Sequence, residues 1–238
     1  MGRAFEYRKA TKMKRWAGMA KNFTKVGREI AIAIKEGGPD PNYNSRLRLA
    51  MQNAKSFNMP KVNVENAIKR ATSKDSENYA EVVYEGYGAH GIAFLVETTT
   101  DNPTRTVANV RMYFDRCKGA LGTSGSVDYM FVRKGVFKIK KEGVDKEDME
   151  LDLIDHGLEE LKEEDDELAL YTSFTDFGMM QKALEERKIE VSSAELIRIP
   201  TLTKKLNDEQ AEQVIKLIDR MEEDDDVANV FHTMDMSE

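Results

Sequence analysis

The chain has 238 residues, of which 40% are hydrophobic and 33% are charged, and its formal net charge is −7. This length favours two or three domains with real cores, and no apolar run approaches the roughly 20 residues of a membrane-spanning helix. The single cysteine, Cys117, excludes an internal disulfide and a thiolate metal cluster, so we expect a soluble protein in a reducing, cytoplasmic location.

The charge is divided sharply along the chain. Residues 1–75 contain 17 Lys and Arg against 6 Asp and Glu, whereas the remaining residues contain 19 against 37. Such asymmetry indicates a polyanion partner at the basic end, with the acidic remainder as scaffold or regulator. The alternative is that the basic residues simply solvate helical surfaces.

The first segment, residues 1–20, mixes cations with Phe5, Tyr7 and Trp16 and shows no clear periodicity. We interpret it as an arm whose aromatics dock onto their own domain, although stacking on bases is the alternative for Trp16. The segment is too poor in serine for a mitochondrial transit peptide, and it lacks the apolar region of a secretory signal.

The first strong helix is predicted from about Met19 to Glu36, before Gly37-Gly38-Pro39. Its apolar residues are Phe23, Val26, Ile30 and Ile34. Its cations fall within about 80° of one another on the opposite side; they are Lys21, Lys25, Arg28 and Lys35. We interpret the cationic side as exposed and facing nucleic acid, so reversing the first three to Glu is expected to leave folding intact.

Two further helices follow and predict a small three-helix bundle. One begins after Pro41 with Asn44 or Ser45 as its cap, and the next begins near Pro60. The candidate nucleic-acid-binding residues of the arm and bundle are Lys9, Lys12, Lys14, Arg15, Lys21, Lys25, Arg28, Lys35, Arg46, Arg48, Lys55 and Lys61.

After a polar linker at residues 72–79, the pattern changes to strands at 79–85 and 92–98. The intervening Gly86–Gly91 satisfies G-x-G-x-x-G, but a strand follows it, so we predict a hairpin loop and no dinucleotide site. Asp101-Asn102-Pro103 predicts the start of a helix that continues to about Arg116, with Cys117 packed at its end.

The next stretch predicts a compact α+β unit. A loop at residues 119–125 precedes predicted strands at 127–132 and 136–140, a helix at 149–161, a strand at 168–172, a helix at 177–188 and a strand at 194–199. Fourteen acidic residues lie between Glu142 and Glu167, which we interpret as a solvated face, with nucleic-acid mimicry or cation binding as alternatives.

Asn207 and Gln210 predict a capping box before the last helix, and a terminal strand is predicted around Val230–Thr233. Because this last helix and strand need a sheet, we infer that the chain returns to complete the earlier domain. The predicted class is α+β with three domains. They are a basic helical domain (1–75), a central α+β domain (76–134 plus 203–238) and an inserted acidic α+β domain (135–202).

No constellation indicates catalysis, a cofactor or a metal. The three histidines, His90, His156 and His232, lie in different predicted elements without metal-ligand spacing, and Cys117 has no local activating partner. Phosphate-loop and nucleophile-elbow motifs are absent. We therefore do not expect an enzyme.

Several segments together resemble the YebC family of probable transcriptional regulatory proteins over nearly the whole length. They are Phe23-Thr-Lys25, Arg28-Glu-Ile30, Gly37-Gly-Pro-Asp-Pro41, Asn44-Ser-Arg-Leu-Arg48, Asn58-Met-Pro-Lys61, Tyr84-Glu-Gly-Tyr-Gly88, Thr100-Asp-Asn102, Arg105-Thr106, Gly125-Ser-Val127, Arg133-Lys-Gly135, Asp225-Asp-Val227 and Val230-Phe-His232. The opening departs from the family, with Gly2-Arg-Ala-Phe-Glu-Tyr7 in place of Gly-His-Ser-Lys-Trp.

The resemblance implies a helical N-terminal domain, two α+β domains, and no cofactor or catalytic residue. It implies a DNA-binding transcription regulator; since no base-reading helix stands out, we expect contact largely through backbone phosphates. The alternative is a ribosome-associated factor that binds ribosomal RNA and relieves stalling, or a translational activator, with basic ribosomal proteins as further partners. We expect no membrane partner and a monomer.

Overall fold

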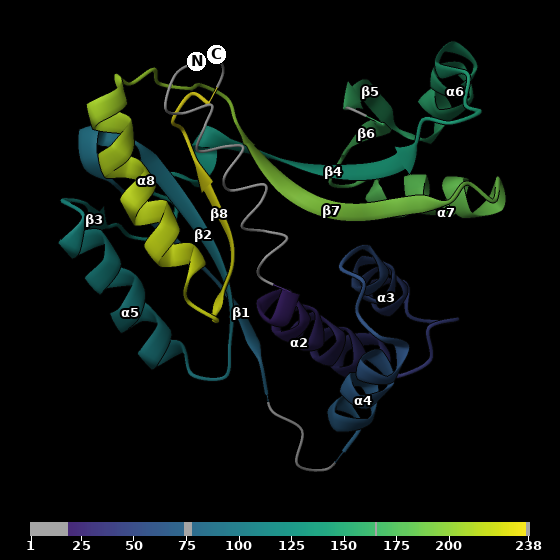
Figure 1. Ribbon diagram of the computed structural model, residues 1–238, viewed down its shortest axis with the longest axis horizontal. Helices are drawn as coiled ribbons and strands as arrows, with labels where there is room; N and C mark the ends of the chain where they lie inside the picture. The colour runs from purple at the N-terminus through teal and green to yellow at the C-terminus, as the bar shows by residue number, and fades with distance from the viewer. Residues whose placement is uncertain (1–18, 74–77, 165, 237–238) are drawn as a thin grey trace. The chain divides into compact units, whose positions relative to one another are not determined.

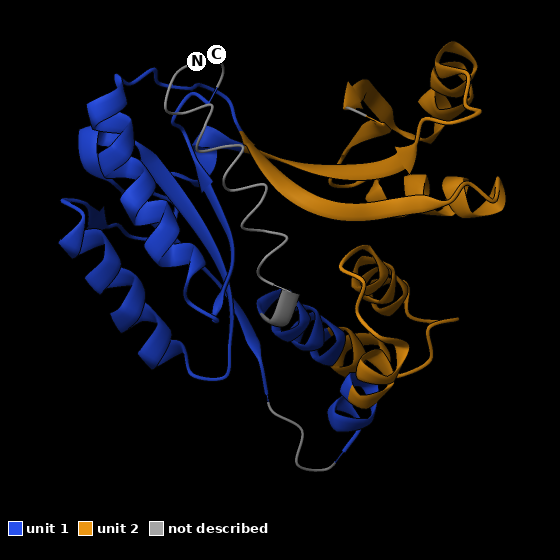
Figure 2. Cartoon of the chain, viewed as in Figure 1, with its two compact units in different colours: residues 1–32, 67–131, 200–238 blue, residues 33–66, 132–199 orange. Residues whose placement is uncertain are grey.

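The computed structural model describes residues 19–73, 78–164 and 166–236. The chain divides into two compact units (Figure 2). Unit 1 comprises residues 1–32, 67–131 and 200–238, and unit 2 comprises residues 33–66 and 132–199. Each unit contains one four-stranded sheet, which confirms the predicted α+β class.

The elements are labelled in Figure 1. The helices are α2 (Met19–Gly37), α3 (Ser45–Ser56), α4 (Lys61–Ala71), α5 (Pro103–Arg116), α6 (Lys146–Leu153), α7 (Phe177–Glu186) and α8 (Asp208–Glu222). The strands are β1 (Ala80–Tyr87), β2 (Ala93–Thr100), β3 (Ala120–Leu121), β4 (Phe131–Lys140), β5 (Leu158–Glu164), β6 (Glu167–Ser173), β7 (Val191–Pro200) and β8 (Val227–His232). Single 3-10 turns lie at Ala89–Gly91, Asp128–Met130 and Ile154–His156.

The end of α2 and the start of α3 follow the predicted signals. Gly38 has a φ of +81° and its N–H donates to the Ile34 carbonyl at 2.8 Å, which ends α2. The Asn44 side chain accepts from the Leu47 N–H at 3.0 Å and caps α3, so Asn44 is the cap and the alternative, Ser45, is the first helical residue. Its amide also donates to the Ala33 carbonyl at 2.6 Å, so one buried side chain joins the end of α2 to the start of α3.

The sheet of unit 1 has the order β3-β1-β2-β8, and its neighbouring strands are antiparallel. Apolar side chains of α5 and α8 pack against β2 on one face of this sheet, where both helices lie in Figure 1. Phe94 of β2 meets Phe114 of α5 edge to face at 5.9 Å between ring centroids. Strand β8 pairs directly with β2, so the last segment of the chain completes a sheet begun near residue 80.

The glycine-rich segment between β1 and β2 is the predicted hairpin connection. The two strands pair from Ala80↔Thr100 to Tyr87↔Ala93. Between them, His90 and Gly91 have φ values of 62° and 73°. The backbone thus reverses direction through left-handed residues, and no helix follows that could receive a pyrophosphate.

The sheet of unit 2 has the order β5-β6-β4-β7. Its core contains Phe137 and Ile139 of β4, Leu168 and Leu170 of β6, and residues of α7 such as Leu184. Leu49 of α3 also packs against this cluster. The side chain of Asn53 on α3 exchanges hydrogen bonds with the backbone of Ala194 on β7, at 2.9 and 3.2 Å, and further fixes α3 to the sheet.

Two predicted strands, at residues 127–132 and 136–140, are wrong as separate elements. Residues Asp128–Met130 form a 3-10 turn, and β4 runs without interruption through Gly135. A Cβ atom at Gly135 would lie 2.3 Å from Phe177 and 2.8 Å from Thr172. The glycine therefore marks a close approach of α7 to the sheet and does not mark a turn.

The predicted helix at residues 149–161 is also wrong beyond its first turns. Helix α6 ends at Leu153, Gly157 adopts a φ of +87°, and Leu158 begins strand β5. Leu158 and Leu161 are both buried although three residues apart, because a register shift between Leu158 and Glu160 turns both toward the core. This β-bulge mimics helical spacing in the sequence. The short strand β3 was likewise predicted as loop.

In the described part of the chain, no helix combines the length and apolarity needed to cross a membrane. The predicted boundaries of the three domains stay predictions.

Candidate nucleic-acid interface

The cationic side of α2 contacts other elements of unit 1, at the end of α8, in β8 and at the end of β2. Lys21 donates to the Glu222 carbonyl, and Lys25 donates to the Ala228 carbonyl at 2.9 Å. Nη1 of Arg28 donates to the carbonyls of Thr99 and Asp225, at 2.8 and 2.6 Å. The prediction that these three cations form an exposed row is therefore wrong. The end of α8 and the start of β8 cover the part of the cationic side that carries these three residues. Lys35, farther along the same side, remains exposed.

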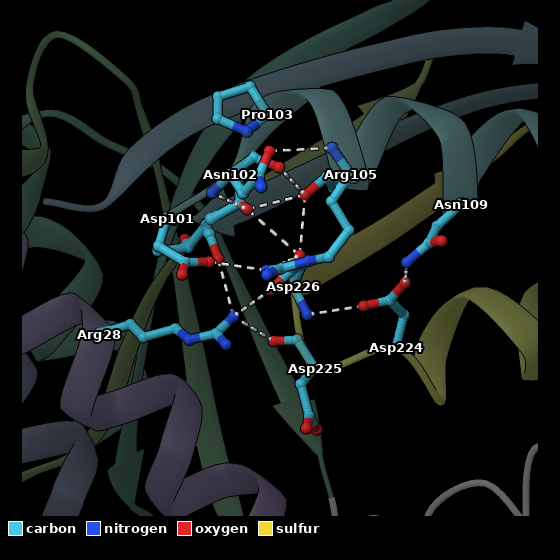
Figure 3. Close-up of polar contacts among 12 residues, drawn as sticks. Arg28, Asp101, Asn102, Pro103, Arg105, Asn109, Asp224, Asp225 and Asp226 are labelled. Atoms are coloured by element: carbon cyan, nitrogen blue, oxygen red, sulfur yellow. Dashed lines mark hydrogen bonds and ion pairs between the residues drawn. The ribbon is translucent and has the colours of Figure 1, made fainter. Parts of the chain in front are cut away.

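The carboxylate of Asp226 is the centre of the contacts in this region (Figure 3). Its Oδ1 accepts from Arg28 at 3.0 Å, and its Oδ2 accepts from Arg105 and Thr106, each at 2.8 Å. Thr100 donates to the same Oδ2 at 3.2 Å. Only 4% of the Asp226 side chain is exposed. The buried charge is thus satisfied by four donors of the protein, which come from α2, β2 and α5.

The donors determine the protonation state of Asp226. Burial acts to raise its pKa, because a carboxylate is poorly solvated in the interior. The hydrogen bonds from Arg105 and Thr106 and the charges of the two guanidinium groups outweigh burial and hold the pKa below its ordinary value. The group is therefore a permanently charged acceptor at neutral pH.

The start of α5 positions two of these donors. Asn102 caps the helix by accepting from the Arg105 N–H at 3.1 Å, and Pro103 occupies the first turn, as the sequence predicts. Arg105 and Thr106 thus leave the first turn toward Asp226, and Arg105 also bonds Asp101 at 2.7 Å. This contact with two carboxylates raises the pKa of Arg105.

Asp224 joins α5 to the backbone segment that carries Asp226. It accepts from the Tyr113 hydroxyl at 2.9 Å and from the Asn109 amide at 3.2 Å, both on α5. Burial and the neighbouring Asp224 raise the pKa of Tyr113 to about 12. The Asp226 N–H donates to Asp224 Oδ1 at 2.9 Å, so the side chain also fixes the backbone that carries Asp226.

A second buried carboxylate, Glu85 on β1, holds the loop after β3. Its oxygens accept from the backbone N–H groups of Gly125, Val127 and Asp128, at 2.7, 2.8 and 2.8 Å. Its exposure is 5%. The loop is thus fixed by three charge-assisted hydrogen bonds to one side chain.

The other predicted site residues divide into three groups. Lys35, Lys55 and Lys61 are exposed, on α2, α3 and α4 respectively. Arg46 pairs with Glu36 at 2.8 Å, and Arg48 pairs with Glu185 at 3.3 Å. Lys9, Lys12, Lys14 and Arg15 lie outside the described residues. The nucleic-acid-binding role of the whole set stays a prediction.

Sequence reasoning did not single out Arg105, Thr106, Asp226 or Glu85 as interacting residues. Each falls inside a segment that carries the family resemblance, and that was the available signal. Which segments meet could not be read from their order, because Arg28 and Asp226 come from opposite ends of the chain. Among the described residues, no group of three or more His, Cys, Asp or Glu side chains is arranged to hold a metal ion.

Comparison with known proteins covers almost the whole chain. Residues 3–74 match the family model described as the TACO1/YebC protein N-terminal domain, and residues 79–234 match that of the TACO1/YebC second and third domain. The chain is 59% identical over 235 residues to a probable transcriptional regulatory protein of Porphyromonas gingivalis, covering 98% of this chain and 97% of that protein.

A second relative, a probable transcriptional regulatory protein of Flavobacterium johnsoniae, is 56% identical over 234 residues, with 98% of this chain and 99% of that protein covered. The fold is similar to the crystal structure of a conserved hypothetical protein from Aquifex aeolicus, with a TM-score of 0.80 and 37% identity. The match covers 92% of this chain and 91% of that one.

Proposed function

The chain belongs to the TACO1/YebC family, and on this premise we propose that it is a nucleic-acid-binding regulator of transcription that binds DNA largely through backbone phosphates. Relatives that match nearly its full length are named probable transcriptional regulatory proteins. For this chain we add the mode of DNA binding, through backbone phosphates, and the lysines that make the contacts.

The observation that carries the proposal is the surplus of cations in residues 1–75, with 17 Lys and Arg against 6 Asp and Glu. Lys21, Lys25 and Arg28 belong to this surplus, but their side chains donate hydrogen bonds to backbone carbonyls elsewhere in unit 1. Lys35, Lys55 and Lys61 remain exposed on the helical region and are the cations that we assign to phosphate contacts. Such contacts neutralise phosphates and release counterions, so affinity falls as salt rises.

The test compares two triple charge reversals in DNA binding over a series of salt concentrations. The first is Lys35→Glu with Lys55→Glu and Lys61→Glu. The matched control is Lys118→Glu with Lys205→Glu and Lys216→Glu, which changes net charge equally at exposed positions of unit 1. We expect the first variant to lose about tenfold or more in affinity and its log–log salt slope to flatten by about 2 to 3, since each phosphate contributes about 0.9.

The control variant should keep most of the wild-type salt slope. Equal loss in both variants would show that overall charge governs binding and would contradict the assigned residues. An affinity that does not change with salt in the wild-type protein would contradict phosphate-led binding altogether.

The acidic stretch of unit 2 favours a second candidate, a translation factor that binds ribosomal RNA. Residues 142–167 contain 14 Asp and Glu, a charge suited to the basic proteins that accompany ribosomal RNA. Crosslinking the protein to nucleic acid in cells and sequencing the bound fragments separates the candidates. Discrete promoter sequences support the regulator, whereas predominantly ribosomal RNA supports the translation factor.

A further inference from the structure

Unit 2 contains a groove between helix α6 and the edge strand β5. It has a volume of about 420 Å³ and is lined by residues of both elements and of the turn that joins them. Leu158 and Leu161 of β5 are buried and contribute to its lining. Leu151 and Ile154 also line it, but they are 73% and 63% exposed. Leu151 and Ile154 thus extend the apolar floor of the groove to the surface. A contiguous apolar surface rimmed by polar residues is typical of an interaction site.

The groove is acidic on both sides. Glu147 and Glu150 lie on the α6 side, and Glu159 and Glu160 lie on the β5 side. The surrounding stretch, residues 142–167, holds 14 Asp and Glu against 2 Lys. Glu159 and Glu160 form ion pairs with Lys134 and Lys162. Ion pairs at a protein surface typically contribute under about 1 kcal/mol, so the cations of a partner can compete for these carboxylates.

This arrangement determines the chemistry of the occupant. We propose that the groove binds a cationic amphipathic helix of a partner protein. The apolar stripe of such a helix would cover Leu151 and Ile154, and Lys or Arg on both flanks of the stripe would face the two acidic sides. The complementarity requires an apolar centre with cations on either side, a pattern that an amphipathic helix presents on one face.

Strand addition fits the groove less well than a helix. Strand β5 is an edge of the sheet, but a register shift between Leu158 and Glu160 interrupts its regular pairing. A β-bulge of this kind blocks an added strand from following the edge. In an added strand, moreover, alternate side chains would point to solvent and away from the carboxylates.

The proposal does not depend on nucleic-acid binding and is tested with the full-length protein. The probe is a synthetic helix of leucine and lysine, about 18 residues or five turns long, with Leu at helical spacing. Its comparison peptide has the same composition in an order that disperses the leucines around the helix. We expect the wild-type protein to bind the amphipathic peptide about tenfold more tightly than the dispersed one.

Two variants locate the binding. Leu151→Ser with Ile154→Ser should bring the two peptides to equal, weak affinity. Glu147→Gln with Glu150→Gln should weaken both peptides and reduce the salt dependence of binding. The control, Val62→Ser with Leu202→Ser, changes exposed apolar side chains elsewhere and should bind like the wild-type protein. Equal binding of both peptides to the wild-type protein overturns the proposal, as does a preference that survives the Leu151 and Ile154 changes.

Discussion

Arg28 and Asp226 lie 198 residues apart in the sequence, and Nη1 of Arg28 is 3.0 Å from Oδ1 of Asp226. Their side chains are 14% and 4% exposed. This buried ion pair joins the middle of α2 to the residue that precedes β8. Because Arg28 also bonds two backbone carbonyls, the side chain is a structural part of unit 1.

Replacing Asp226 by Asn should therefore destabilise unit 1. The change removes the counter-charge of Arg28 and Arg105 while keeping the volume of the side chain, and breaking one partner of a buried pair costs about 3 kcal/mol or more. Urea unfolding at neutral pH measures the loss. The matched control, Glu36→Gln, breaks the exposed pair with Arg46 and should cost under about 1 kcal/mol.

The same variant has a defined pH dependence. The pKa of Asp226 is lowered in the folded protein, so its contribution to stability is complete above the unfolded value of about 3.9 and is lost as pH falls through the folded value. The free energies of unfolding of the wild-type protein and Asp226→Asn should thus differ most near neutral pH and converge below about pH 4. A difference that persists unchanged in acid would mean that the lost charge is not its cause.

Reversing Lys21, Lys25 and Arg28 together to Glu should destabilise the protein, contrary to the expectation from the helical wheel. Three carboxylates would then face backbone carbonyls and the acidic residues at the end of α8. Thermal unfolding followed by circular dichroism should show a clear decrease in Tm. Lys35→Glu with Lys55→Glu and Lys61→Glu is the control, since exposed changes cost within about 0.5 kcal/mol each. Equal Tm values for the two variants would contradict the role of the α2 contacts.

His232 should make the free energy of unfolding depend on pH in a range above that of Asp226. Burial lowers its pKa to about 4 from an ordinary value of 6.5, and its Nδ1 has no hydrogen-bond partner. Between these two values the unfolded chain binds the proton and the folded protein does not, so stability falls as pH falls, by roughly 3 kcal/mol in total. His232→Phe keeps the ring beside Phe94 and should remove this part of the dependence. Parallel stability curves for both proteins from pH 7 to about 4 would show that His232 does not contribute.

Gly135→Ala should destabilise unit 2. The new methyl group would overlap Phe177 and Thr172, and overpacking of a core typically costs about 1 to 3 kcal/mol. Gly178→Ala is the matched control in the adjacent helix α7, because nothing lies within 4 Å of its added Cβ. There alanine should be neutral or stabilising by up to about 1 kcal/mol. Urea unfolding of both variants measures the contrast, and equal effects would show that Gly135 tolerates a side chain.

The sequence alone predicted the elements whose signals are local. The Asn44 cap of α3, the Asn102-Pro103 start of α5 and the Asn207–Gln210 capping box of α8 all appear as expected. These signals act over three or four residues, through one side chain that satisfies free N–H groups of the first turn. The apolar spacing of α2 likewise identified buried residues such as Val26 and Ile30.

Only the tertiary structure decided the features that depend on a distant neighbour. Gly135 resembles a turn in the sequence, but Phe177 on α7 requires it within a continuous strand. Leu158 and Leu161 have helical spacing because a bulge, created by pairing with β6, turns both inward. A helical wheel gives the polar face of α2 but not what covers that face, so the contacts of Arg28 with Asp226 follow from the packing of the whole chain.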